Sequence, residues 1–276
     1  MAVGPPVQVS RPVDAVIKLG GDVLEGDVLA DAAAEIARAR AGRRLLVVHG
    51  GGPQTTALAR RLGIEPIIVA GRRITDDPML VVVKRVIAGL NVDLVAALRA
   101  DGVPAFGVSG ASGVIRAHRR PPRIVTGAGD TPIDFGLVGD IDGFDMDVLD
   151  ALDARDALPV IACLGADAAG TVLNINADVV ASQLAAAVRA GALVACTAVG
   201  GVRRDKDDPA TRLPLLTVAE AKAAIADGTV QGGMIPKLEE AFAPLAAGVG
   251  AVHIVAPTEI ATSLLNPGSV GTLLVP

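Results

Sequence analysis

Several charged residues and glycines of this chain lie at the ends of apolar runs or just after them. Lys18 lies near the end of the run "AVIKL", three glycines follow the run "LLVVH", and Lys237 follows two more glycines in "QGGMIPK". An ammonium group in an apolar strand is expensive unless it is paired or functional. Bare backbone N–H groups between a strand and a helix favour an anion. Together these residues predict a site for a ligand with several negative charges.

Two further segments add polar side chains that suit the same kind of ligand. "GRRITDD" places Arg72 and Arg73 after an apolar run, and a guanidinium group can donate two parallel hydrogen bonds to a carboxylate. "LNINADVV" places Asn174 and Asp178 at the start of a predicted helix, where an aspartate is also an ordinary N-terminal residue. Each segment taken alone could instead have a purely structural role, as a tight turn or as an ordinary helix cap.

Familiar nucleotide motifs do not explain the three glycines. A Walker A loop requires a Gly-Lys pair, which does not occur in this chain. A dinucleotide fingerprint requires G-x-G-x-x-G, whereas "GGGPQT" ends in Thr55. A net charge of −5 and the absence of Trp and Tyr disfavour a nucleic-acid partner. The basic cluster at 116–123 is interpreted as a solvated loop.

The elements that must position these residues alternate along the chain. Short apolar runs are separated by Ala- and Leu-rich helical patterns, which indicates a mainly parallel sheet covered on both faces. We predict an α/β fold, a three-layer α/β/α sandwich with an open sheet and two lobes, and a site at the carboxyl ends of the strands. The segment 111–143 is predicted to form a β-hairpin or lid. Strands are expected at 15–19, 44–49, 66–70, 104–109, 158–163, 193–199, 251–256 and 271–275, and helices at 27–41, 53–63, 77–100, 145–156, 178–190, 217–226 and 236–247.

The cysteines and the N-terminal residues indicate the cellular compartment of the protein. Cys163 and Cys196 both lie in apolar runs, which suits free thiols in a reducing compartment. The first residues contain no apolar core of a secretory signal. No run approaches the roughly 20 apolar residues of a transmembrane helix. A cytoplasmic protein without membrane contact is expected.

Six motifs occur in the order that is typical of one family of kinases. They are "KLGG" (18–21), "VVHGGGPQ" (47–54), "GRRITDDPM" (71–79), "DFGLVGDI" (134–141), "NINADVVA" (174–181) and "GGMIPKLEEA" (232–241). By these motifs the chain resembles the amino acid kinase family from residue 14 to its C-terminus, and within that family it is most similar to the N-acetylglutamate kinases. The combination of G-x-R-x-T, N-x-N-A-D and G-G-M-x-x-K is specific, whereas each piece alone is weak.

The resemblance implies ATP-dependent phosphorylation of the side-chain carboxylate of N-acetyl-L-glutamate, a step of arginine biosynthesis. It implies Mg²⁺ that is carried on the nucleotide, with no metal site of the protein's own. It also implies a homodimer, with an N-terminal lobe (1–165) for the amino-acid substrate and dimerisation and a C-terminal lobe (166–276) for ATP. Because the first predicted strand begins at residue 15, the long N-terminal helix of arginine-regulated hexamers is not expected, and we expect a dimer that is insensitive to arginine.

The same motifs assign roles to individual residues. Lys18 and Lys237 would neutralise the phosphoryl group from opposite sides during transfer, and Asp178 would hold both lysines. The acceptor carboxylate is already ionised at pH 7, so no general base is needed, and His49 is expected to support the glycine turn. The catalytic set is Lys18, Lys237, Asp178, Gly51 and Gly52; the acceptor-binding set is Gly50, Gly51, Gly52, Arg73 and Asn174; the nucleotide-binding set is Lys18, Gly20, Gly21, Thr197, Gly201, Gly233 and Lys237.

The chain also departs from the family pattern. Ala198 in "CTAVGGV" stands where the family commonly has Asp, and Ser112 stands where an Asp-Gly pair is common. The first departure predicts ATP or Mg²⁺ binding that is weaker or arranged differently. Two alternatives stay open: a sister kinase of carrier-protein-linked α-aminoadipate or glutamate, in which the basic cluster at 116–123 would contact an acidic carrier, and a pseudokinase or ligand-binding module.

Overall fold

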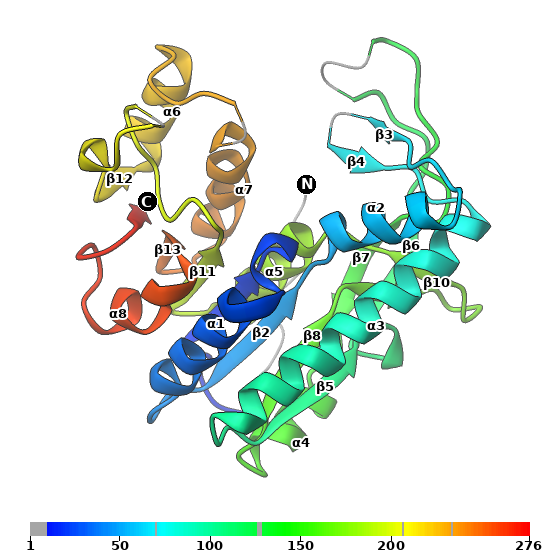
Figure 1. The fold of residues 1–276 in the computed structure, drawn as a ribbon, viewed down its shortest axis with the longest axis horizontal. Helices are drawn as coiled ribbons and strands as arrows, with labels where there is room; N and C mark the ends of the chain where they lie inside the picture. Colours follow the sequence, from blue (N-terminus) through cyan, green and yellow to red (C-terminus); the bar gives the residue numbers. More distant parts are fainter. Residues whose placement is uncertain (1–9, 70, 126–128, 206, 233) are drawn as a thin grey trace.

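The computed structural model describes residues 10–69, 71–125, 129–205, 207–232 and 234–276 (Figure 1). Its main sheet contains eight strands: β1 (Ala15–Leu19), β2 (Leu45–His49), β5 (Ala105–Ser109), β8 (Leu158–Ala162), β11 (Ala192–Cys196), β12 (Leu215–Thr217), β13 (Ala251–Val255) and β14 (Thr272–Val275). They lie in the order β12-β14-β13-β11-β1-β2-β8-β5. All neighbours are parallel except β13 and β14. The predicted, mainly parallel open sheet is confirmed.

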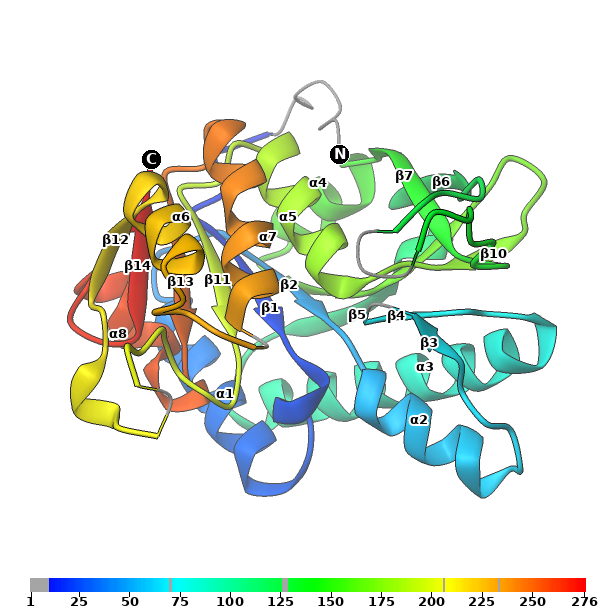
Figure 2. The same cartoon turned by 90° about the horizontal axis from the view of Figure 1, so that it is seen from above.

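Helices cover both faces of this sheet. They are α1 (Gly26–Ala39), α2 (Gly52–Arg61), α3 (Asp77–Ala100), α4 (Asp147–Asp153), α5 (Ala177–Ala187), α6 (Val218–Ala226), α7 (Met234–Ala246) and α8 (Ile260–Leu265). Figure 2 shows α1, α2 and α3 on one side of the strands and α4, α5 and α7 on the other, which confirms the three-layer sandwich. In the described part of the chain, no helix has both the length and the apolar character that a bilayer span requires.

The alternation of side chains along β1 decides which helix faces its lysine. Ala15, Ile17 and Leu19 belong to the apolar cluster that includes residues of α1 and α3. Val16 belongs to the other cluster, which includes residues of α5 and α7. Because side chains alternate along a strand, Lys18 shares the face of Val16 and points toward the α5 layer.

Smaller sheets flank the main one. The segment 111–143 contributes β6 (Ile115–Arg119) and the first residues of β7 (Gly139–Phe144), which pair antiparallel, so the predicted hairpin is confirmed. These strands join β9 (Leu164–Ala166) and β10 (Val172–Asn174) in a four-stranded sheet. The predicted strand at 66–70 is wrong as a member of the main sheet. Only β3 (Ile68–Val69) forms there, in a hairpin with β4 (Arg72–Arg73). Ile68 is exposed, and Val69 packs against a small separate cluster that includes Phe135 instead of the core of the main sheet. Ala70 lies outside the described residues.

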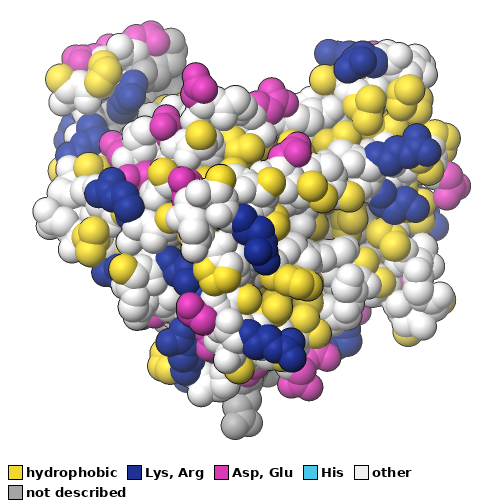
Figure 3. Space-filling model, turned by 60° about the horizontal axis from the view of Figure 1, so that its bottom comes forward, with side chains coloured by type: hydrophobic (Ala, Val, Ile, Leu, Met, Phe, Trp, Pro, Cys, Tyr) yellow, Lys and Arg dark blue, Asp and Glu magenta, His cyan; other side chains and the backbone are white. Residues whose placement is uncertain are grey.

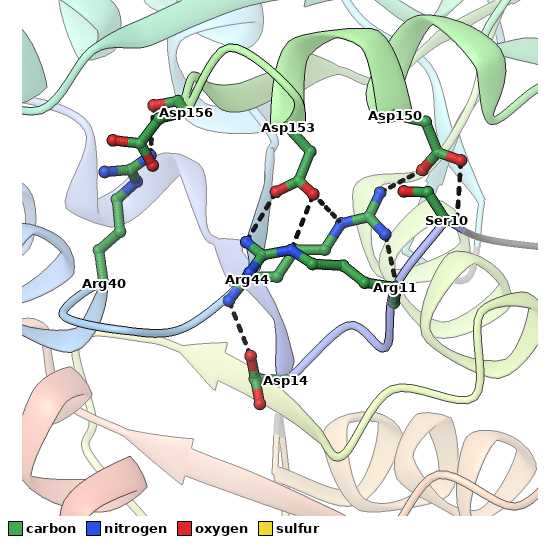
Figure 4. Close-up of polar contacts among 8 residues, drawn as sticks. All are labelled: Ser10, Arg11, Asp14, Arg40, Arg44, Asp150, Asp153 and Asp156. Carbon is green, nitrogen blue, oxygen red and sulfur yellow. Dashed lines mark hydrogen bonds and ion pairs between the residues drawn. The ribbon is translucent and has the colours of Figure 1, made fainter.

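A network of charges fixes the segment before β1 to α4 (Figure 4). The Arg44 side chain is 2% exposed and pairs with Asp150, and the Arg44 backbone N–H donates to Asp14 at 2.7 Å. Arg11 pairs with Asp153 at 2.8 Å. Asp14 and Arg44 directly precede β1 and β2, so this network lies at the amino ends of the parallel strands, opposite the end that carries Lys18.

Candidate active site

Lys18 is the penultimate residue of β1, which lies between β11 and β2 near the middle of the sheet. Its Nζ atom is 2.5 Å from Oδ1 of Asp178, in the first turn of α5, and the lysine side chain is 12% exposed. Burial by itself lowers the pKa of Lys18, but the charge and hydrogen bond of Asp178 outweigh it, so the pKa is raised. The ammonium group therefore stays charged at the end of the strand.

The three glycines after β2 have three different environments. The N–H of Gly50 donates to the Leu19 carbonyl at 3.0 Å, so it is not free for a ligand. A Cβ on Gly51 would lie 2.6 Å from Cδ1 of Leu90, so a side chain there would have to displace side chains of α3. A Cβ on Gly52 would meet nothing within 4 Å. Close helix packing explains Gly51, whereas Gly52 leaves the N-terminus of α2 open to the cavity.

His49 supports this turn from beneath. It is fully buried at the end of β2, with Nδ1 3.0 Å from the Gly50 carbonyl oxygen and Nε2 3.0 Å from Nδ2 of Asn91 on α3. Burial lowers the pKa of His49, which keeps the ring neutral. The histidine is thus placed to hold the loop, as expected, and does not line the cavity above it.

A cavity of about 320 Å³ lies at the carboxyl end of β1 and β2. Arg73 Nη2 donates to the Gly52 carbonyl at 3.1 Å and to Thr56 Oγ1 at 2.8 Å. Its Nη1 is buried without a hydrogen-bond partner among the described residues. Such a buried donor is costly to leave unpaired, so it fits a carboxylate ligand. Predicted residues that line this cavity are Lys18, Gly20, Gly21, Gly50, Gly51, Gly52, Arg73, Asn174 and Asp178.

A second, larger cavity of about 740 Å³ lies on the side of β11 and α7. Its lining includes Gly201, Gly232 and Lys237, as well as Arg204. Gly201 has φ of 113°, a conformation that favours glycine, and a Cβ there would lie 3.1 Å from the Gly271 backbone. The predicted nucleotide residue Gly233 lies outside the described residues.

A small junction joins the two cavities through shared lining residues. It has a volume of about 30 Å³ and is lined by Lys18, Asp178, Thr197, Lys237 and Glu240, among others. Lys18 also lines the first cavity, and Lys237 also lines the second. The two predicted ammonium groups therefore line one small pocket that shares residues with both cavities, and the glycine turn lines the cavity on the Lys18 side.

Lys237 lies in the first turn of α7 and differs from Lys18 in its partners. Within the described residues it makes no ion pair, so the structure joins Asp178 to Lys18 alone and not to both lysines. Burial lowers the pKa of Lys237, and the negative charge of Asp22 opposes this shift more strongly than any other charge does. Asp22 was not among the predicted site residues.

Two further charged residues that line the first cavity, Glu240 and Arg120, were not predicted as site residues from the sequence. Glu240 lines both the first cavity and the junction, and burial together with the charge of Asp178 raises its pKa to about 7. Its spacing of three residues from Lys237 on a helix was the available signal, because such residues share a face. Arg120 is 4% exposed, pairs with Asp140 of β7 at 2.7 Å and also lines the first cavity. The prediction of a solvated loop at 116–123 is therefore wrong: residues 116–119 belong to β6, and Arg120 is buried because β7 supplies a charge that permits burial.

Comparisons with known proteins agree with these observations. A model of the amino acid kinase family matches residues 15–256. The chain is 52% identical over 266 residues to an acetylglutamate kinase of Anaeromyxobacter dehalogenans (strain 2CP-1), covering 94% of this chain and 98% of that relative. It is also 52% identical over 267 residues to an acetylglutamate kinase of Sorangium cellulosum, covering 95% and 94%.

A solved structure of N-acetylglutamate synthase from Neisseria gonorrhoeae, complexed with coenzyme A and N-acetyl-glutamate, has the same fold. Its TM-score is 0.80 at 24% identity, and the match covers 95% of this chain and 59% of that one. At this identity the likeness concerns the fold alone. The family match over most of the chain, together with two relatives at 52% identity, shows that the chain belongs to the amino acid kinase family.

Proposed function

We propose that this chain transfers the γ-phosphoryl group of ATP to the side-chain carboxylate of N-acetyl-L-glutamate, producing N-acetylglutamyl 5-phosphate and ADP for arginine biosynthesis. The observation that carries the proposal is the Lys18–Asp178 pair, which lines both the cavity that contains Arg73 and a small pocket shared with Lys237, a lining residue of the second cavity. Membership of a kinase family implies the use of ATP. The choice of acceptor is supported by the acetylglutamate kinases at 52% identity.

The proposed reaction needs charge neutralisation and not proton transfer. An oxygen of the ionised acceptor carboxylate attacks the γ-phosphorus while the bond to the bridging oxygen breaks, and the electron pair leaves with ADP. Such a step depends on positioning and on neutralising developing charge. In this proposal Lys18 and Lys237, which line the same small pocket, supply positive charge from two sides, and the N-terminus of α2 at Gly52 adds a backbone dipole.

In this proposal the acceptor's α-carboxylate binds the unpaired Nη1 of Arg73 and the amide of Asn174, whose Nδ2 donates to Thr75 Oγ1 at 3.1 Å. No group of three or more His, Cys, Asp and Glu side chains in the described ranges is arranged to hold a metal ion. We therefore propose that Mg²⁺ enters with the nucleotide phosphates.

The division of labour between residues 1–165 and 166–276 belongs to the same proposal. The first part supplies Lys18, the glycine turn and Arg73, and the second supplies Gly201 and Lys237. The halves share one continuous sheet, since β1 pairs with β11 across the proposed boundary. Asn174 and Asp178 of the second part also line the acceptor cavity, so binding of the acceptor would draw on both halves.

A homodimer is proposed on the basis of the free edge of the main sheet. β5 is the edge strand, and Phe106 on it is 51% exposed. Val81 and Val92 on the neighbouring α3 are 42% and 66% exposed. Figure 3 shows groups of hydrophobic side chains between the charged ones over the right half of the face that it presents. Exposed apolar groups beside an open edge suit association with a second copy. A cytoplasmic location is proposed from the buried free thiols Cys163 and Cys196.

The test of the proposed function is an acyl-phosphate assay with hydroxylamine as the trap. Purified protein with ATP and Mg²⁺ is given N-acetylglutamate, N-acetylaspartate or N-acetyl-α-aminoadipate in parallel. Hydroxamate formation with N-acetylglutamate at the highest kcat/KM is the expected result. No hydroxamate with any of the three, or a clear preference for another chain length, would contradict the proposal.

The alternative of a carrier-linked acceptor has less support from the structure. Arg119 and Arg120 of the basic cluster pair with Asp134 and Asp140, so part of the positive charge that an acidic carrier would need is already neutralised. The alternative of a pseudokinase is disfavoured by the intact Lys18–Asp178 pair and by Lys237 at the same junction.

A further inference from the structure

The cavity that contains Arg73 is lined by further arginines. Arg72 lies beside Arg73 on β4, and Arg120 and Arg123 follow β6 of the four-stranded sheet; all four residues line this one cavity. Asp140 of β7 accepts a hydrogen bond of 2.9 Å from Nε of Arg120. Within the described part of the chain, the guanidinium group of Arg123 makes neither an ion pair nor a hydrogen bond. Arg123 is therefore a cationic residue of the cavity wall that no carboxylate of the described chain neutralises.

The backbone holds Arg123 at this wall. Arg123 and Ile133 form an antiparallel bridge, in which the N–H of Arg123 donates to the Ile133 carbonyl at 3.2 Å and the N–H of Ile133 donates back at 2.9 Å. Ile133 packs against a small apolar cluster around Phe135, and Val69 of β3 packs against the same cluster. The segment that carries Arg123 is thereby attached to the β3–β4 hairpin without any contact of its guanidinium group.

The charges around Arg123 are mostly like charges. Burial lowers its pKa, the charges of Arg120 and Arg72 lower it further, and Asp140 acts in the opposite direction. A guanidinium group stays protonated in a protein, so it cannot relieve this repulsion by losing a proton. Several guanidinium groups along one cavity focus a positive potential in it, and this potential attracts an anion.

The cavity brings together positive groups from two different sheets. Lys18 lies at the carboxyl end of β1 in the main sheet, 2.5 Å from Asp178. The arginines come from β4 and from the segment after β6, which belong to the smaller sheets. A ligand with one carboxylate at each end suits this division. In the proposed reaction the side-chain carboxylate of the acceptor meets Lys18, so the α-carboxylate is the group left for the arginines.

We propose that Arg123 is a second guanidinium group for the α-carboxylate of the acceptor, in addition to Arg73, and that it restricts the site to acceptors in which this carboxylate is free. Arg120, which Asp140 holds in place, adds positive charge beside it. A glutamate whose α-carboxyl group is amidated, as it is inside a peptide, would leave these donors without an anion and bind weakly. The inference rests on the proposed function of this site.

The first test compares two ligands by isothermal titration without nucleotide: N-acetylglutamate and its α-carboxamide, N-acetylisoglutamine. The wild type should prefer N-acetylglutamate, and Arg123→Gln should reduce this preference by about tenfold to 100-fold, as expected for a lost hydrogen bond between charged groups. Affinity for the α-carboxamide should change little. The matched control is Arg116→Gln, at an exposed arginine of the same basic cluster that does not line the cavity, and it should keep the wild-type preference.

A conservative variant shows whether the positive charge is the cause. Arg123→Lys keeps the charge but loses the planar fork, so its preference for N-acetylglutamate should lie between those of the wild type and Arg123→Gln. Circular dichroism checks that each variant is folded. The proposal is wrong if the wild type shows no preference, if Arg123→Gln keeps the full preference, or if Arg123→Lys loses as much as Arg123→Gln does.

Turnover distinguishes this inference from the proposed function. In the hydroxylamine assay, Arg123→Gln should raise KM for N-acetylglutamate by about the factor by which it weakens binding, and leave KM for ATP nearly unchanged. If the titrations give the expected preferences but the wild type forms no hydroxamate, the proposed function is refuted and the role of Arg123 in carboxylate binding is retained. If hydroxamate forms while Arg123→Gln keeps the preference, only the role of Arg123 is refuted.

Discussion

Glu240 should make the free energy of unfolding depend on pH, and the size of this effect can be calculated from the pKa shift in the structure. This carboxyl group on α7 is partly buried and lines the junction beside Lys18 and Asp178. Burial and the charge of Asp178 raise its pKa from 4.5 to about 7, although Lys18, Arg72 and Lys237 act in the opposite direction. The folded protein therefore holds a proton on Glu240 at pH values where the unfolded chain has released it.

The sign of the effect follows from this difference in bound protons. A raised pKa in the folded state means that the stability contributed by Glu240 falls as pH rises from 4.5 to about 7, and it levels off above that. With 1.36 kcal/mol per pKa unit, the wild type should lose about 2.5 kcal/mol of stability through this group between pH 5 and pH 8. Glu240→Gln is neutral at every pH and should lose none of it.

The assay compares unfolding of wild type and Glu240→Gln at the two pH values without nucleotide. Because the chain has no Trp or Tyr, circular dichroism replaces intrinsic fluorescence as the probe. Relative to the wild type, the variant should gain about 5–10 °C in Tm on going from pH 5 to pH 8. Glu239→Gln, at an exposed position on the same helix, is the control and should show no such gain. Equal pH dependence in wild type and Glu240→Gln would refute the reasoning.

Three further predictions concern catalysis, binding and assembly. Lys18→Ala and Lys237→Ala should each lower kcat by about 100-fold or more while the folded state is kept, as circular dichroism checks; near-wild-type kcat in both variants would remove the proposed mechanism. Arg73→Ala should raise KM for N-acetylglutamate and leave KM for ATP nearly unchanged in steady-state kinetics, because Arg73 lines the proposed acceptor cavity and not the second one; equal losses for both substrates would contradict this assignment. Phe106→Asp, at a side chain 51% exposed on the edge strand, should convert a dimer into a monomer by light scattering, and a dimer that persists would place the interface elsewhere.

Much of the framework was predictable because it depends on local pattern. β1 and α3 were predicted at the residues where they occur, since a short run in which four of five residues are apolar and a long helical pattern are strong local signals. The rule that ligands lie at the carboxyl ends of parallel strands then located the site. β12 (Leu215–Thr217) was missed, because a three-residue strand at the rim carries little periodic signal.

The environments of single residues could not be predicted from the sequence in the same way. The three consecutive glycines looked alike in sequence, yet the N–H of Gly50 donates to the Leu19 carbonyl and Gly51 packs against side chains of α3. Arg120 looked like part of a solvated basic run, but Asp140 from the partner strand permits its burial. In each case the deciding neighbour is distant in sequence.

The sequence by itself determined the order of the elements, the family and the residue types at the ends of the strands, because hydrophobic period and motif spacing are properties of neighbouring residues. Only the tertiary structure decided which charges lie together: among the described residues Asp178 pairs with Lys18 and not with Lys237, and burial together with the charge of Asp178 raises the pKa of Glu240 to about 7. The physical reason is that electrostatic energies depend on separation and burial in three dimensions, and these are set when β1, β11, α5 and α7 pack together.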